Sequence, residues 1–145
     1  MRAGIIGIGS YLPEKVLLNT ELEKMVNTTN EWIVERTGIL SRRIAEANIS
    51  SSDLGAEAAK LAIENANLKP EDIDMIISAS SSPDCTFPAT ACVIQEKIKA
   101  KNAAAFDVQA ACTGFVYGLT TAAQYIMTGE CKNVLVVGSE VLSKI

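Results

Sequence analysis

Residues 106–115 read Phe106-Asp107-Val108-Gln109-Ala110-Ala111-Cys112-Thr113-Gly114-Phe115. An apolar strand is predicted to end here in small residues, and Cys112 opens the helix that follows. At a helix start, free backbone N–H groups and the helix dipole favour a thiolate over a thiol, and they can stabilise an oxyanion on an attacked thioester. Ala110, Ala111 and Gly114 are expected to leave room for a substrate. Cys112 is therefore a candidate nucleophile, although a buried, inert cysteine fits the pattern equally well.

The flanking sequence alternates between strand and helix patterns, which predicts an α/β domain with a mostly parallel sheet. Apolar strands are expected at residues 3–9, 75–80, 105–108 and 134–137, and helices at 19–26, 30–37, 53–65, 88–99 and 112–127. Residues 50–53 offer capping side chains for the third helix, and Pro88 suits the first turn of the fourth. Because the strands are apolar, helices are expected on both faces of the sheet. No linker is visible, so residues 1–145 are expected to form one domain.

The composition excludes several classes of function. The net charge is −4 and no basic stripe appears, so nucleic acid is not an expected partner. The four cysteines, Cys85, Cys92, Cys112 and Cys131, form no C-x-x-C element, so no metal site is expected and the thiols should be reduced. The segment containing Gly7 and Gly9 lacks the third glycine of a dinucleotide-binding loop. The chain has no histidine to act as a base beside a cysteine.

The chain is expected to be cytoplasmic. No charged segment and no cleavage site of small residues follow Met1, so no signal peptide is predicted. The stretch between Asp107 and Glu130 has no charge and is long enough to cross a bilayer, but it contains several glutamines and threonines. A helix buried on all sides by protein explains that stretch better than a membrane span.

A second candidate site lies in residues 30–39, which contain the only tryptophan. Trp32 and Arg36 are four residues apart, hence on one face of the predicted helix. An indole and a guanidinium so placed can stack on a purine and reach a phosphate, and Arg42 and Arg43 add positive charge nearby. From the residues alone, a Trp packed at the domain edge with Arg lying across it is the favoured alternative.

Taken together, these segments resemble the β-ketoacyl-ACP synthase III family over essentially the whole chain. The matching stretches are residues 7–13, 30–39, 87–91, 106–115 and 136–140. The resemblance implies a thiolase fold of two similar halves. This chain would be the N-terminal half, ending before the last strand of its own sheet.

The resemblance also implies an activity and the residues that perform it. Cys112 would take an acyl group from acyl-CoA, and the acyl-enzyme would condense with malonyl-ACP with loss of carbon dioxide. Coenzyme A would enter as the substrate thioester, with no separate cofactor. Trp32 and Arg36 would hold its nucleotide end, with Thr28 and Thr37 lining the approach. Phe87 would cap the partner's acyl pocket in a homodimer.

The family uses a histidine and an asparagine of its second half to stabilise the enolate left by decarboxylation. The C-terminal half of the same enzyme is therefore an expected partner, and this chain alone is not expected to condense substrates. Related alternatives are HMG-CoA synthases and polyketide synthases. An alternative of another class is a non-catalytic dimerisation or scaffold module with the same fold.

Overall fold

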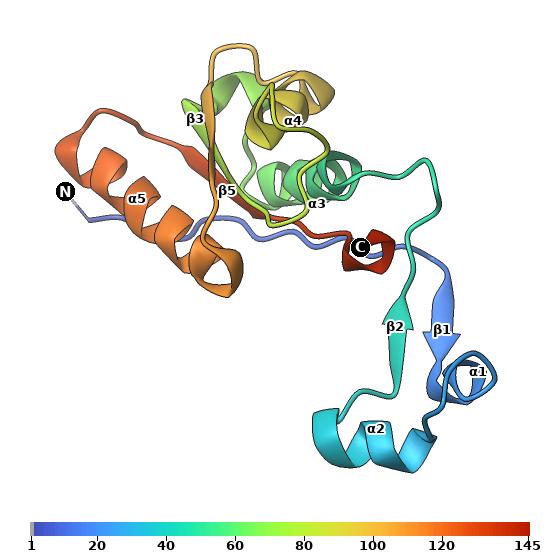
Figure 1. Cartoon of the computed structure of the whole chain (residues 1–145). Coiled ribbons are helices and arrows are strands. Elements are labelled where there is room, and N and C mark those ends of the chain that lie inside the picture. Colours follow the sequence, from blue (N-terminus) through green and yellow to red (C-terminus); the bar gives the residue numbers. More distant parts are fainter. Residues whose placement is uncertain (1) are drawn as a thin grey trace. The chain divides into compact units, whose positions relative to one another are not determined.

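The computed structural model describes residues 2–145, and these divide into two compact units. The larger unit contains the residues up to Tyr11 together with Ile49–Ile145, and the smaller unit is Leu12–Asn48. Each unit is built around its own hydrogen-bonded strands (Figure 1).

The larger unit contains a three-stranded parallel sheet in the order β4-β3-β5. Its strands are β3 (Met75–Ala79), β4 (Ala104–Val108) and β5 (Val134–Gly138). Met75 of the central strand lies opposite both Ala104 and Val134, so the carboxyl ends of all three strands meet at one edge. The predicted strands at 75–80, 105–108 and 134–137 are confirmed to within about one residue. Each is a short apolar run in which side chains alternate between two covered faces.

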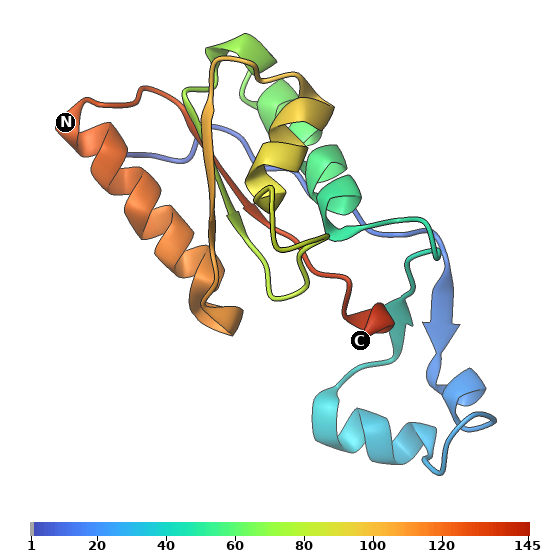
Figure 2. The same ribbon diagram turned by 45° about the horizontal axis from the view of Figure 1, so that its top comes forward.

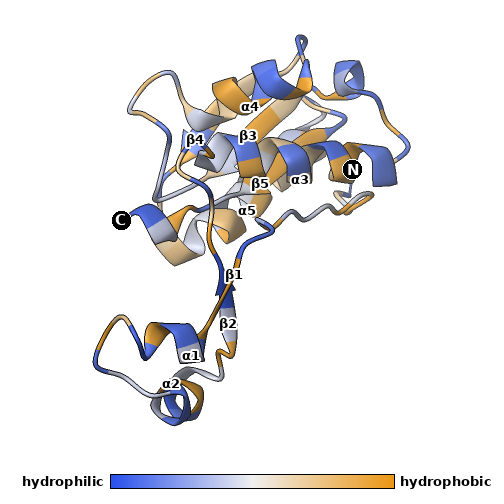
Figure 3. Ribbon diagram, turned by 90° about the vertical axis from the view of Figure 1, so that its right-hand side faces the viewer, coloured by the Kyte–Doolittle hydropathy of each residue, from blue (hydrophilic) through white to orange (hydrophobic). Residues whose placement is uncertain are grey.

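Helices cover both faces of this sheet, as predicted (Figure 2). On one face, α3 (Ser51–Asn65) and α4 (Thr90–Ile98) pack with Ile76, Leu135 and Val137. On the other face, α5 (Gly114–Thr128) packs with Ile77. Figure 3 shows β3 and β5 in hydrophobic colours between helices that also carry hydrophilic residues. Short 3₁₀ turns complete the unit at Pro70–Asp72, Ala111–Thr113 and Leu142–Lys144.

Helix α5 is less buried than its sequence predicts. Only Gly114, Gly118 and Ala122 on this helix are buried, whereas Phe115 and Tyr117 are exposed. The prediction of a helix covered on all sides is therefore wrong for residues 2–145, because α5 contacts the sheet through one face and no described element covers the other. No helix in this part of the chain is long and apolar enough to span a membrane.

Residues 3–9 do not form the predicted strand, since no described strand pairs with them. They lie instead against α3, where the Asn65 side-chain amide donates a hydrogen bond of 2.7 Å to the Ile8 carbonyl. A Cβ atom added to Gly7 would lie 2.3 Å from the Ala62 carbonyl oxygen, and one on Gly9 would lie 2.2 Å from that of Ala58. The glycines therefore permit close approach to a helix rather than to another strand.

The start of α3 is fixed by a capping box, as the serine cluster predicts. The Ser50 backbone N–H donates to the Asp53 carboxylate at 2.8 Å, and Lys97 of α4 donates to the same carboxylate. Partial burial opposes ionisation of Asp53, but the hydrogen bonds from Lys97 and Ser50 outweigh it and lower the pKa to about 2.

Stability is therefore expected to fall in acid through Asp53. Because its folded-state pKa lies below the ordinary value of 3.8, ionised Asp53 stabilises the fold above about pH 4, and this contribution is lost between about pH 4 and pH 2. Asp53→Asn should cost about 1 kcal/mol at pH 7 and give a shallower acid decline in urea denaturation followed by circular dichroism. Glu57→Gln, in an exposed pair with Lys60, is the control and should change little. An unchanged acid profile in Asp53→Asn would contradict this assignment.

The smaller unit contains an antiparallel pair, β1 (Val16–Leu18) and β2 (Ser41–Arg43), with two helices between them in sequence. The helix α2 (Asn30–Thr37) matches its prediction, but α1 (Asn19–Leu22) is shorter than the expected 19–26. Strand β1 was not predicted, because three residues are too few to show a period.

Asn19 links the elements of the smaller unit and is 1% exposed. Its side-chain amide donates to the Asn30 side-chain oxygen at 3.0 Å and to the Ile39 carbonyl at 2.7 Å. Its own oxygen accepts from the Arg42 guanidinium at 2.7 Å. One buried amide therefore joins α1, α2 and β2.

Asn19→Ala should destabilise the smaller unit by about 2 kcal/mol, because the three hydrogen bonds that its buried amide makes to Asn30, Ile39 and Arg42 would be lost. Urea unfolding followed by the fluorescence of Trp32, the only tryptophan, reports on this unit. Asn27→Ala provides an exposed control that should leave the midpoint unchanged. Equal midpoints for Asn19→Ala and the unmodified chain would show that the three hydrogen bonds contribute nothing.

Candidate active site

Cys112 lies at the edge of the sheet where the parallel strands end. After β4, the chain passes through Gln109 and Ala110 into the 3₁₀ turn Ala111–Thr113, and α5 starts at Gly114. The cysteine therefore lies in the turn before α5, two residues before the observed start at Gly114, rather than at the first position of the helix as predicted, and it is exposed. In open parallel sheets, ligands bind outside this edge, so the position suits a nucleophile.

The first turn of α5 has no side-chain cap. The Thr113 hydroxyl donates to the Ala110 carbonyl at 2.8 Å instead of accepting from the helix. The Gly114 N–H bonds the Ala111 carbonyl, which ties the turn to the helix. A helix start without a capping side chain keeps its partial positive charge available to a negative group.

Gly114 serves packing rather than substrate access, which corrects the sequence-based expectation. It is buried, and a Cβ added to it would lie 3.3 Å from the Cβ of Ala79 and 3.5 Å from the Val108 carbonyl oxygen. The absence of a side chain therefore lets α5 approach the ends of β3 and β4.

Ala111 has a left-handed backbone with φ of +45°, next to the cysteine. A non-glycine residue in this region costs about 1 kcal/mol or more. We expect Ala111→Gly to raise the free energy of unfolding by about 1 kcal/mol in urea denaturation. Ala110 has a φ of −143°, so Ala110→Gly should instead destabilise the chain and serves as the matched control. Equal losses in the two variants would show that the turn stores no strain at Ala111.

Asp107 at the end of β4 holds the neighbouring helix. Its carboxylate accepts hydrogen bonds from the backbone N–H groups of Thr90 at 2.7 Å and Ala91 at 2.8 Å. Sequence reasoning missed this role, and it also placed the helix start too early, at Pro88. The signal was present: Ala89 at the N-cap has no side chain that could cap α4, so a carboxylate from elsewhere was needed.

The other cysteines differ in exposure. Cys131 is buried in a turn, and burial, Asp74 and Glu130 raise the pKa of its thiol. Cys92 is half-buried, with its sulfur 3.7 Å from the Ala105 carbonyl oxygen. Cys85 is exposed in a loop. Two exposed thiols therefore compete for any reagent, at residues 85 and 112.

Phe87 lies in the loop between β3 and α4 and is 83% exposed. The loop is fixed on both sides by carboxylates. Asp84 accepts hydrogen bonds from the backbone and hydroxyl of Ser52, and Glu140 accepts from the Ser81 N–H and the Ser82 hydroxyl. A large apolar ring is thus presented to solvent by an anchored loop, which suits an interface role.

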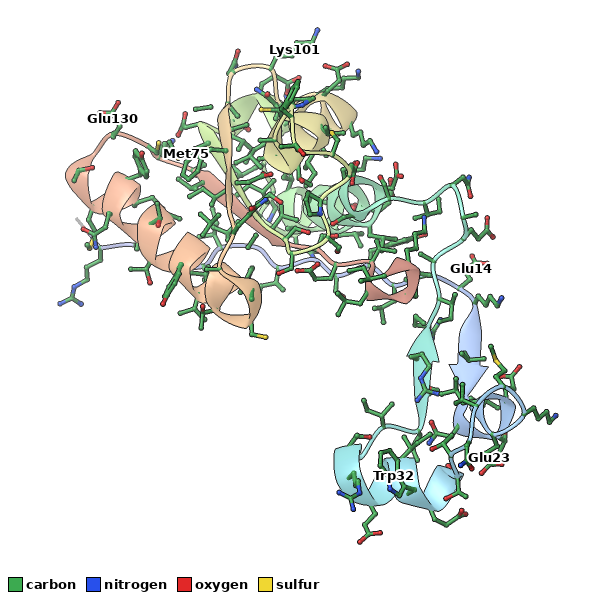
Figure 4. All side chains as sticks on the ribbon, in the orientation of Figure 1. Glu14, Glu23, Trp32, Met75, Lys101 and Glu130 are labelled. Carbon is green, nitrogen blue, oxygen red and sulfur yellow. The ribbon has the colours of Figure 1, made fainter. Side chains whose placement is uncertain are left out.

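Within the smaller unit, Trp32 and Arg36 lie together on α2. Figure 4 labels Trp32 on this helix. The guanidinium carbon lies 5.2 Å from the centre of the indole, and Trp32 is 54% exposed. Thr28 carries a buried hydroxyl without a hydrogen-bond partner among the described residues. The Thr37 hydroxyl donates to Ile33 and accepts from Ile39, so it helps to end the helix.

The guanidinium groups of Arg42 and Arg43 form hydrogen bonds within the smaller unit. Arg42 donates to the Leu17 carbonyl and to Asn19, whereas Arg43 donates to the carbonyls of Pro13 and Glu14. Both guanidinium groups therefore hold the segment around β1. The stacked Arg36 is the better candidate for contact with a ligand.

The sequence was compared with those of known proteins. Residues 106–145 match the family model for 3-oxoacyl-[acyl-carrier-protein] synthase III. The β-ketoacyl-[acyl-carrier-protein] synthase III of Caldanaerobacter subterraneus is 59% identical over 143 residues, which cover 99% of this chain and 43% of that protein. The chain is similar to β-ketoacyl-ACP synthase III enzymes over nearly its whole length. It spans less than half the length of the relatives that it matches.

Solved structures of a synthase III and of a polyketide ketosynthase share the fold. The Aquifex aeolicus synthase III is 51% identical, with a TM-score of 0.94, and the match covers 97% of this chain and 45% of that one. The priming β-ketosynthase of the R1128 polyketide pathway is 35% identical, also with a TM-score of 0.94, and the match covers 97% of this chain and 42% of that one. The predicted α/β architecture of thiolase type is thus confirmed for the part of those structures that this chain covers.

Proposed function

We propose that this chain supplies the acyl-accepting part of a synthase that starts fatty-acid synthesis. The main support for this proposal is the exposed Cys112 in the turn between β4 and α5, within the stretch that matches the family model. The Cys112 thiolate attacks the carbonyl carbon of an acyl-CoA, and a carbon–sulfur bond forms. The bond to coenzyme A then breaks, and coenzyme A leaves and takes up a proton. The start of α5 stabilises the oxyanion between these steps.

Trp32 and Arg36 are proposed to bind the nucleotide end of coenzyme A. An exposed indole with a guanidinium 5.2 Å from its centre offers a flat surface for adenine and a cation for phosphate. Thr28 and Thr37 are the proposed lining of the approach. The buried, unpartnered hydroxyl of Thr28 supports a polar contact there, whereas Thr37 contributes mainly by ending α2.

The second reaction is proposed to be condensation with malonyl-ACP. Loss of carbon dioxide leaves an enolate, whose carbon attacks the acyl group on Cys112, so that a carbon–carbon bond forms and the thiolate is freed. This chain has no histidine, so the histidine that the family uses must come from the part of the enzyme that this chain does not span. A cytoplasmic homodimer, with Phe87 at its interface and residues 1–145 as one domain of each subunit, completes the proposal.

The acyl-transfer proposal is tested by incubating the purified chain with acetyl-CoA and measuring its intact mass. One acetyl group per chain, mapped to Cys112 by peptide mass spectrometry, is the expected result. No adduct in a protein that spans the family's full length would support the non-catalytic scaffold instead. Addition of malonyl-ACP should give no β-ketoacyl product, and sustained turnover by this chain alone would contradict the role given to the missing histidine.

The match to a polyketide priming synthase favours one alternative within the same chemistry. Both alternatives transfer an acyl group to the cysteine, so they differ in the acyl group and in the carrier. A panel of acyl-CoA primers with fatty-acid and polyketide carrier proteins, applied to a protein that spans the family's full length, separates the two.

A further inference from the structure

The loop between β3 and α4 is attached to the rest of the larger unit at both of its ends. At its start, the Glu140 carboxylate accepts a hydrogen bond of 2.6 Å from the Ser81 N–H. At its far end, the Asp107 carboxylate accepts one of 2.7 Å from the Thr90 N–H at the start of α4. Residues 83–89 form the span between these two anchors.

Asp84 anchors the middle of this span to α3. Its carboxylate lies at the start of that helix, where it accepts a hydrogen bond of 2.9 Å from the Ser52 N–H and another from the Ser52 hydroxyl. Ser52 is 0% exposed, and its N–H is one of the groups at a helix start that have no partner within the helix. The helix dipole also favours an anion at this position.

Lys97 of α4 directs the Ser52 hydroxyl toward Asp84. Its ammonium donates to the Ser52 oxygen at 2.7 Å, so the hydroxyl proton is turned to the Asp84 carboxylate. The same ammonium pairs with Asp53. Partial burial of Asp84 opposes its ionisation, but the hydrogen bonds from Ser52 outweigh it and hold the pKa below its ordinary value. The loop is therefore fixed by charge-assisted hydrogen bonds, which are stronger than those between neutral groups.

The placement of the Phe87 ring depends on the backbone of this loop. The ring is 83% exposed, so packing against the other described residues contributes little to its position. Phe87 follows Asp84 by three residues, inside the span that only ends at Thr90. Release of Asp84 would free the middle of the loop while both ends stay attached. The effect should therefore reach Phe87 without unfolding the larger unit.

We propose that Asp84 is a positioning residue, which fixes Phe87 in the orientation that caps the acyl pocket of a partner subunit. This inference rests on the proposed function, in which Phe87 lies at the interface of a homodimer. A fixed ring gives the pocket a definite depth, whereas a mobile ring yields to a longer acyl chain. Asp84 thereby limits the length of the acyl group that the enzyme accepts, and it does so through Phe87.

The motion of the loop is measured first, in the 145-residue chain with Cys112 replaced by serine. A nitroxide label on the exposed Cys85 reports this motion in the electron paramagnetic resonance spectrum. Asp84→Asn removes the charge that holds the loop, so the label should become more mobile. Glu96→Gln removes an exposed carboxylate of α4 and should leave the spectrum unchanged. An equally immobile label in Asp84→Asn would overturn the proposal.

The selectivity for the acyl group is measured next, in a protein that spans the family's full length. Asp84→Asn should shift the ratio of kcat/KM at least about five-fold from acetyl-CoA toward octanoyl-CoA, through KM more than through kcat. In a Phe87→Ala background, the same substitution should shift the ratio no further, because Asp84 acts through Phe87. Asp84→Glu keeps the charge but lengthens the side chain. It should shift the ratio in the same direction, and it decides the test if Asp84→Asn does not fold.

The outcomes separate this inference from the proposed function. An equal loss of kcat/KM with both acyl groups, or the same shift with and without Phe87, would show a purely structural role for Asp84 and overturn the inference. Normal acylation with unchanged selectivity in the Asp84 variants would contradict the inference alone. If the full-length protein with the original sequence forms no acyl adduct, the proposed function fails and this inference fails with it.

Discussion

Replacing Cys112 by serine should remove the acetyl adduct completely. A serine hydroxyl in the same turn is a much weaker nucleophile than a thiol and needs a base to accept its proton. The chain has no histidine to serve as that base. After equal times with acetyl-CoA, the intact mass should show an acetyl group on the chain with the original sequence. The Cys112→Ser variant should carry none.

Cys85 is the matched control for this experiment, because it is the other exposed thiol. It lies in a loop, with its sulfur 3.7 Å from the Pro88 carbonyl oxygen. Cys85→Ser should therefore keep the adduct. Loss of the adduct in Cys85→Ser but not in Cys112→Ser would move the nucleophile to the loop and end the proposed role of the β4–α5 turn. Buried Cys131, whose pKa is raised, should stay unmodified until the chain unfolds.

Gly118→Val should destabilise the larger unit by about 3 kcal/mol, because the space behind this residue is already filled. A Cβ atom on Gly118 would lie 3.0 Å from Val136 Cγ1 and 3.6 Å from Ile77 Cγ2, and valine adds two further methyl groups. The sheet must then separate from α5, which would expose the core on that face. Urea denaturation followed by circular dichroism measures the loss.

Gln124→Val is the control, since it places the same side chain on the exposed side of α5. It should cost only the difference in helix propensity, well under about 1 kcal/mol. If Gly118→Val and Gln124→Val unfold at the same urea concentration, the close packing of α5 on β3 and β5 contributes nothing. Because the Cys112 turn joins the start of α5, we also expect Gly118→Val to slow acylation in whatever fraction stays folded.

Much of the larger unit could be predicted because its signals are local. The strands of residues 75–79, 104–108 and 134–138 are mostly apolar runs, and α3 shows both a helical period and a capping serine. Cys112 could be named as a candidate nucleophile for the same reason, because the small residues around it are adjacent in the sequence. The structure then places Cys112 in a turn before α5 and exposes it, but its role as a nucleophile stays a prediction.

The predictions that failed depended on partners distant in sequence. Residues 3–9 have a strand-like sequence, yet a strand exists only where a neighbour offers hydrogen bonds, and no described segment does. Helix α5 is uncharged and largely apolar, but burial depends on what covers it, and among residues 2–145 only the sheet does.

The sequence by itself determined which residues favour helix or strand and where a thiol follows a strand, because dihedral preference and hydrophobic period act over a few residues. Tertiary structure alone decided which groups the side chains of Asp107 and Asn19 bind. Asp107 caps α4 across 17 positions of sequence, and Asn19 joins three elements of the smaller unit. Hydrogen bonds of this kind form only after packing has brought their partners within about 3 Å, so a local pattern can show that a cap is missing but not which distant residue supplies it.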